Sequence, residues 1–128
     1  ASLHMRLTVP RGRGRDAYPN SPMGAVALAR QTLYDATWYQ QAWSAFESNP
    51  LVARPERNAA LGALRPYQRG AGLVVIDSLN ELYFLRADRF LREFALHAVI
   101  RGSGHEYRQI EAISKSGRTV IVPLDFPK

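Results

Sequence analysis

The sequence predicts an α/β fold, a β-α-β-α-β parallel sheet that follows a long helix and a shorter helix. Three continuous apolar runs carry this prediction: Leu73–Ile76, Ala98–Ile100 and Thr119–Val122. A segment with the apolar spacing of an amphipathic helix lies between each pair of neighbouring runs. Such alternation is typical of parallel sheets that are covered by helices on both faces or closed into a barrel. Because strand-helix-strand crossovers are right-handed, we expect the three strands to be neighbours in chain order.

The length of 128 residues and the hydrophobic content of 46% fit one domain with a real core. We assign residues 21–128 to this α/β domain, a partial barrel, and residues 1–20 to an irregular N-terminal segment. Its first five residues, ASLHM, resemble a cloning scar ahead of a start methionine. The chain has no cysteine, which excludes disulfides and thiolate metal sites. It also lacks a signal peptide's apolar centre and a run long enough to span a membrane, so we expect a soluble protein.

Two helices are expected before the first strand. Ser21 and Pro22 are suited to the N-cap and first position of a helix that extends to about Glu47. Its aromatic side chains favour packing against the core or a partner. A second, weaker helix is expected from Pro55 to about Gln68, where Pro66 bends or ends it.

The helix after the first strand is predicted from a capping-box pattern of Ser78 and Glu81. Five residues are expected on its buried face: Tyr83, Ala87, Phe90, Leu91 and Phe94.

A short helix is expected to open at Ser103 after the second strand and to end at a Gly117 C-cap. Its inward residues are predicted to be Tyr107, Ile110 and Ile113.

Charged residues follow the three strands at the same end. They are Asp77, Arg101 and Asp125. The carboxyl ends of parallel strands form the edge at which α/β proteins place their chemistry. Asp77 and Arg101 are therefore the candidate catalytic residues, as a ligand, a general base or a substrate clamp.

The stretch VIRGSGHEY, from Val99 to Tyr107, has two interpretations. Backbone amides and a positive charge at a helix start attract anions, which makes Arg101, Gly102, Ser103 and Gly104 a candidate anion-binding loop. The spacing matches neither the dinucleotide fingerprint nor a Walker loop. A plain turn between a strand and a helix needs the same residues for geometry alone, and we favour the turn.

Metal ligands are sparse. Asp77, Glu81, His105, Glu106 and Asp125 are potential donors near one edge, but a zinc site requires three or four ligands that converge. Asp77 and His105 are weak metal candidates, and no metal site or bound cofactor is predicted.

The net charge of +6 would attract phosphate or nucleic acid, and the RGRGR stretch at residues 11–15 is the strongest candidate for such contacts. Many arginines, however, lie at helical spacing from acids, as Arg92 does from Asp88. We therefore favour solvated helix faces over a nucleic-acid interface.

The order of these motifs resembles a known family. The segments GLVVIDSLNEL, RADRFLREFALHAVIRGSGHEY and SKSGRTVIVPLDFP, with YPNSPMGAVALARQTLYDATWY before them, resemble the later half of a metal-dependent amidohydrolase barrel. The resemblance is strongest to the imidazolonepropionase-like and prolidase-like branch and covers roughly residues 12–127.

The resemblance implies a fragment of an eight-stranded (β/α) barrel whose parent uses zinc or another divalent metal to hydrolyse an amide or ring C–N bond in a small-molecule substrate. It also implies metal-binding histidines after two of these strands. Asp77 and Arg101–Gly102 stand at those positions instead. We therefore expect this chain to be inactive alone.

A different class of function remains open. A non-catalytic α/β module with unpaired parallel strand edges would self-associate into dimers or larger oligomers, with the long helix over one edge. A weaker alternative is a module that binds anions or nucleic acid through RGRGR and RGSG.

Overall fold

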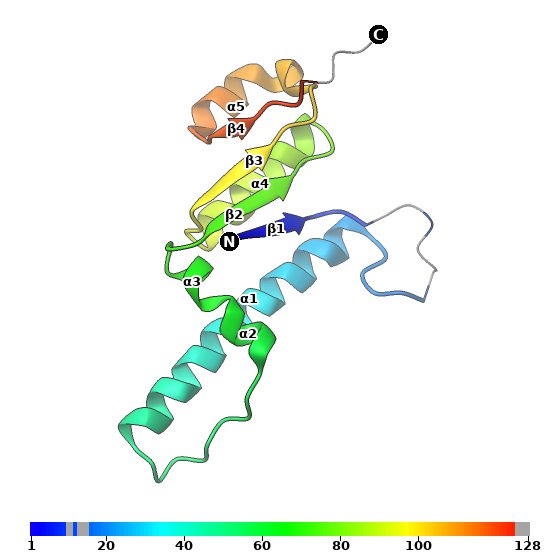
Figure 1. Ribbon diagram of the computed structural model, residues 1–128. Helices are drawn as coiled ribbons and strands as arrows, with labels where there is room; N and C mark the ends of the chain where they lie inside the picture. The colour runs from blue at the N-terminus through cyan, green and yellow to red at the C-terminus, as the bar shows by residue number, and fades with distance from the viewer. Residues whose placement is uncertain (10–11, 13–15, 125–128) are drawn as a thin grey trace.

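The computed structural model describes residues 1–9, 12 and 16–124. Its elements follow the order β1 (Ser2–Arg6), α1 (Pro22–Ser48), α2 (Ala59–Ala63), α3 (Arg65–Gln68), β2 (Leu73–Asp77), α4 (Glu81–Glu93), β3 (Ala98–Arg101), η1 (Glu106–Gln109), α5 (Ile110–Ser116) and β4 (Val120–Ile121). The four strands form one parallel sheet in the order β1-β2-β3-β4 (Figure 1). The predicted α/β class, the parallel pairing and the neighbouring strands are confirmed.

Strand β1 corrects the prediction for the N-terminal segment. Ser2–Arg6 is not irregular but pairs in parallel with β2, from Ser2 opposite Leu73 to Arg6 opposite Asp77. Leu3 and Met5 point to the core side and pack against the main hydrophobic cluster. The alternation of polar and apolar residues in SLHMR is that of a strand with one buried face.

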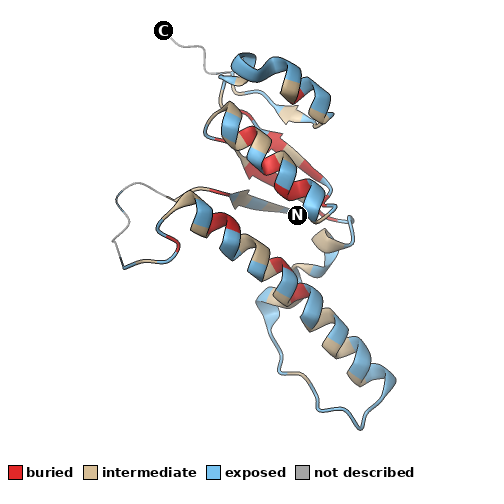
Figure 2. Ribbon diagram, turned by 180° about the vertical axis from the view of Figure 1, so that it is seen from behind, coloured by how far each residue is buried: buried red, intermediate tan, exposed pale blue. Residues whose placement is uncertain are grey.

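The core lies between the sheet and the helices. Val74, Ile76 and Ile100 are fully buried in it and pack with side chains of α4, including Phe84 and Phe90. Helix α4 lies behind β2 and β3 in Figure 1 and in front of them from the opposite side in Figure 2. The face of these strands that Figure 1 presents carries no described helix, so the helices cover one face of the sheet, as on the outside of a barrel.

Helix α1 begins as predicted. Ser21 is the N-cap, and its hydroxyl accepts a hydrogen bond from the Gly24 amide at 3.1 Å. Its buried residues are Ala25, Val26, Leu33 and Ala36, and none lies after Ala36. The expected second helix is two short helices, α2 and α3, which meet at Leu64 just before Pro66.

Two predicted helix faces are wrong in part. In the first turns of α4 the fully buried aromatic is Phe84 rather than Tyr83, because Phe84 lies three residues before Ala87 on the stripe that Phe90 and Leu91 continue. In the last helical segment only Ile113 is buried, whereas Tyr107 and Ile110 are 67% and 58% exposed. Gly117 is the left-handed C-cap of α5, as predicted.

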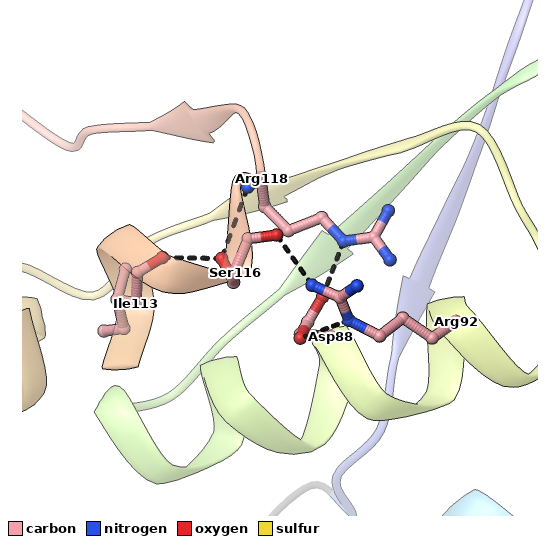
Figure 3. A network of polar contacts seen from close by, with 5 residues as sticks. All are labelled: Asp88, Arg92, Ile113, Ser116 and Arg118. Carbon is pink, nitrogen blue, oxygen red and sulfur yellow. Dashed lines mark hydrogen bonds and ion pairs between the residues drawn. The ribbon is translucent and has the colours of Figure 1, made fainter. Parts of the chain in front are cut away.

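A polar network ties α5 to α4 (Figure 3). Asp88 accepts hydrogen bonds from Arg92 Nε at 2.9 Å and from Arg118 Nε at 2.7 Å. Arg92 also donates to the Ser116 carbonyl at 2.7 Å, so one carboxylate organises the C-terminal end of α5.

None of the helices in the described part of the chain has the length and apolarity that a membrane crossing needs.

Candidate functional site at the strand ends

Three charged side chains lie side by side at the C-terminal ends of β1, β2 and β3. The sheet register places Arg6 opposite Asp77 and Asp77 opposite Arg101. Arg6 donates to Asp77 Oδ2 from Nη2 at 3.0 Å and from Nε at 3.3 Å. Arg101 Nη1 lies 3.7 Å from Asp77 Oδ1, an ion pair beyond hydrogen-bond distance. The Asp77 carboxylate is thus held between two guanidinium groups.

This charged row lines a cavity of about 300 Å³. The other lining residues come from the loops that follow β2, β3 and β4: Ser78, Leu79, Gly102, Ser103 and Pro123. Both arginine side chains are more than half exposed, at 61% for Arg6 and 58% for Arg101. Their guanidinium groups are therefore available to a ligand in the cavity, whereas Asp77 is 27% exposed.

Ser78 joins the ends of two strands. Its hydroxyl donates to the Arg101 carbonyl at 2.8 Å, and its amide donates to the same oxygen at 3.0 Å. The predicted capping box at Ser78 and Glu81 is therefore wrong. Asn80 is the N-cap of α4, and its side chain accepts hydrogen bonds from the amides of Leu82 and Tyr83.

Glu106 occupies the candidate anion-binding loop, for which the sequence favours a plain turn. Its carboxylate accepts hydrogen bonds from the Ser103 amide at 2.6 Å, the Gly104 amide at 2.8 Å and the Ser103 hydroxyl at 3.0 Å. Partial burial favours the neutral carboxyl, yet these hydrogen bonds outweigh it and hold the pKa of Glu106 below its ordinary value. The Gly102 amide donates to the Ile121 carbonyl at 2.9 Å. An external anion would thus have to displace Glu106 to reach the amides of Ser103 and Gly104.

Gly102 is the residue that leaves room for this arrangement. A Cβ atom at that position would lie 2.9 Å from the Glu106 carboxylate, closer than real Cβ contacts allow. Gly102, a member of the candidate anion-binding loop, therefore leaves space for the Glu106 carboxylate rather than for an external phosphate.

The residues present do not fit the zinc site that the family resemblance implies. No group of three or more His, Cys, Asp or Glu residues converges anywhere in residues 1–9, 12 and 16–124. Asp77 faces two cations, and His105 is exposed just before η1. Asp125, the third predicted strand-end charge, lies outside the described residues.

Sequence reasoning found Asp77 and Arg101 at this edge and missed Arg6. It named Glu106 as a potential metal donor but not as the acceptor of the loop amides. Arg6 was assigned to the irregular segment, although the alternation of SLHMR could have indicated its strand. The signal for Glu106 is its position three residues after Ser103, which is the spacing of a capping box.

Parallel strands joined by helices on one face, with charged side chains at their C-terminal ends, are the arrangement found in part of a (β/α) barrel. A solved structure shares this fold: the crystal structure of an amidohydrolase from Thermotoga maritima, with a TM-score of 0.81 and 16% sequence identity. The match covers 97% of this chain and 33% of that protein, so the chain spans about a third of its length. At that identity the likeness shows the fold alone. No family model matches the chain, and no curated protein matches it.

Proposed function

We propose that this chain is one part of an amidohydrolase-like barrel in a longer protein that hydrolyses an amide or a ring C–N bond. The observation that carries the proposal is the cavity at the strand ends, where Arg6, Asp77 and Arg101 meet at the edge that barrel enzymes use for chemistry. The likeness of the fold to an amidohydrolase supports the reaction class.

In this proposal Arg101 binds a carbonyl or carboxylate oxygen of the substrate. Its side chain is exposed at the cavity, and no hydrogen bond engages its guanidinium within the described residues. Asp77 is a positioning residue, because its carboxylate lies between Arg101 and Arg6 and orients both. The groups that activate water have to come from outside the described residues, so the chain alone is expected to be inactive.

The test compares this chain with the protein encoded together with its flanking sequence. Both are assayed against N-acyl amino acids with zinc supplied, and the metal content of each is measured. We expect hydrolysis by the longer protein only. In that protein Arg101→Gln should raise KM about tenfold or more, because a hydrogen bond to a charged group is worth about 1.5–3 kcal/mol. Asp77→Asn should move KM in the same direction and leave kcat nearly unchanged.

Arg89→Gln is the matched control, because it removes the same charge from an exposed position on α4 and should leave KM unchanged. A longer protein that hydrolyses none of these substrates would remove the proposed activity. Equal activity of this chain alone would contradict its proposed dependence on other segments.

A second candidate function is self-association of a non-catalytic module. The strand order favours this function. In the described part of the sheet β1 pairs only with β2 and β4 only with β3, so these two outer strands each have one unpaired edge. Unpaired strand edges invite pairing with another chain.

If the chain self-associates, the molar mass from light scattering should rise with concentration to at least twice 14.4 kDa. A proline at His4 should lower this association, because proline removes a backbone donor from the β1 edge. Val99→Pro, within β3 between two paired strands, is a folding control that should unfold the chain instead, because proline removes a ladder donor from the sheet interior. A monomer at all concentrations would exclude this function.

A further inference from the structure

The C-terminal half of α1 extends beyond the sheet. The last buried residue of this helix is Ala36, yet the helix continues to Ser48. Beyond that point it packs against α2 and α3 rather than against the strands, as Figures 1 and 2 show. We call residues 37–69 the arm.

The arm is held in shape by polar contacts between its helices. Gln68 Nε2 donates to the Leu33 carbonyl and to Thr37 Oγ1, both at 2.8 Å, which ties α3 to α1. The Asn58 amide donates to the Tyr39 hydroxyl at 3.0 Å, which ties the start of α2 to α1. A hollow between these helices is therefore formed before any ligand binds.

Such a hollow lies between α1 and the α2–α3 pair, with a volume of about 290 Å³. Arg65 and Arg69 line it one helical turn apart, and Tyr39 and Trp43 line it from α1. Glu47 is the one acid among the lining residues. Neither arginine forms an ion pair with any residue in the described part of the chain, so the hollow carries an excess of positive charge that the chain leaves uncompensated.

Two further observations concern Trp43. Arg54 lies over its ring, with Cζ 5.7 Å from the centroid, which adds a third cation near the hollow. The indole Nε1–H is buried and has no acceptor among the described residues. A buried donor without a partner is unfavourable, but this one is closed to solvent, so a ligand would reach it only if the indole ring moved.

We propose that this hollow binds a small organic anion. Its phosphate or carboxylate group lies between the guanidinium groups of Arg65 and Arg69, which form charge-assisted and bidentate hydrogen bonds to such groups. Its planar apolar part packs against Tyr39 and Trp43. The hollow shares no lining residue with the cavity at the strand ends, so this binding is separate from the proposed hydrolase function.

The test is titration of this chain with phenyl phosphate, followed by tryptophan fluorescence and by isothermal calorimetry. Inorganic phosphate and phenol are titrated in parallel, and benzoate distinguishes a carboxylate ligand from a phosphate ligand. We expect phenyl phosphate or benzoate to bind more tightly than either isolated fragment. The double variant R65Q/R69Q should weaken that binding about tenfold or more, because each guanidinium contributes charged hydrogen bonds.

A matched variant keeps the test specific. Arg89→Gln removes a charge from an exposed position on α4 and should bind with unchanged affinity. Circular dichroism of every variant checks that the helices remain. Equal affinity of R65Q/R69Q and the unsubstituted chain would overturn the proposal, as would an equal loss in Arg89→Gln, which would indicate attraction by net charge alone. No binding of any of these anions would also overturn it.

Discussion

Replacement of Phe84 by alanine is expected to lower the free energy of unfolding by about 3–5 kcal/mol. Phe84 is fully buried in the cluster between α4 and the sheet, with Ile76 and Ile100 among its members. The substitution removes buried apolar surface and leaves a cavity that the surrounding side chains fill only partly. Since small domains are stable by about 5–15 kcal/mol, this loss is a large fraction of the total.

Urea denaturation followed by circular dichroism measures this change. Leu82→Ala is the matched control, because Leu82 lies on the same helix and is 59% exposed. Its loss should stay within about 0.5 kcal/mol. Similar losses in the two variants would show that α4 does not bury the face described here.

Asp88→Asn is expected to destabilise the chain by about 1–3 kcal/mol. The Asp88 carboxylate is 14% exposed and bonds both Arg92 and Arg118, and Arg118 is itself only 19% exposed (Figure 3). The amide that replaces the carboxylate carries no charge and accepts through one oxygen only. The mostly buried Arg118 and the more exposed Arg92 would then lose their counter-charge, and the contact between α4 and α5 would weaken.

The same residue predicts a dependence of stability on pH. Burial favours the neutral form of Asp88, but hydrogen bonds from Arg118 and Arg92 outweigh it and lower its pKa below the ordinary value of 3.8. A carboxyl group whose pKa is lower in the folded chain than in the unfolded chain stabilises the fold at every pH above its unfolded-state pKa. That stabilisation is lost as the pH falls through the folded value.

Thermal unfolding between pH 7 and pH 2 tests this dependence. Asp88→Asn should show a smaller fall in melting temperature below pH 4 than the unsubstituted chain does. Asp35→Asn is the control, because Asp35 is bonded to Gln31 rather than to an arginine. Identical pH profiles for Asp88→Asn and the unsubstituted chain would contradict the role assigned to the network.

The sequence was sufficient for the elements whose signals are local. Three apolar runs identified β2, β3 and β4, and Ser21 and Gly117 marked the ends of helices by capping chemistry that depends on adjacent residues only. The predictions were wrong where contacts between residues far apart in the sequence determine the local structure. Ser78 is a residue type that often caps helices, but its hydroxyl donates a hydrogen bond to the carbonyl of Arg101 on the next strand. Asn80 is the N-cap of α4 instead.

The candidate site divides in the same way. The positions of Asp77 and Arg101 follow from the ends of apolar runs, so both were predicted at one edge. Arg6 joins them only because β1 pairs with a strand 71 residues further along the chain, which no local pattern reveals. For the loop after β3 the sequence favours a plain turn over a binding site for an external anion, and in the structure the Glu106 carboxylate occupies its amides.

Glu106 has one more consequence for the strand-end cavity. Where a binding loop becomes ordered only when its ligand arrives, the lost conformational entropy of the loop lowers the affinity. Here Ser103 and Gly104 are already bound by a carboxylate on the neighbouring 3₁₀ turn. The loop therefore loses its freedom once, when the chain folds, and it presents the same rigid wall to every molecule that enters afterwards.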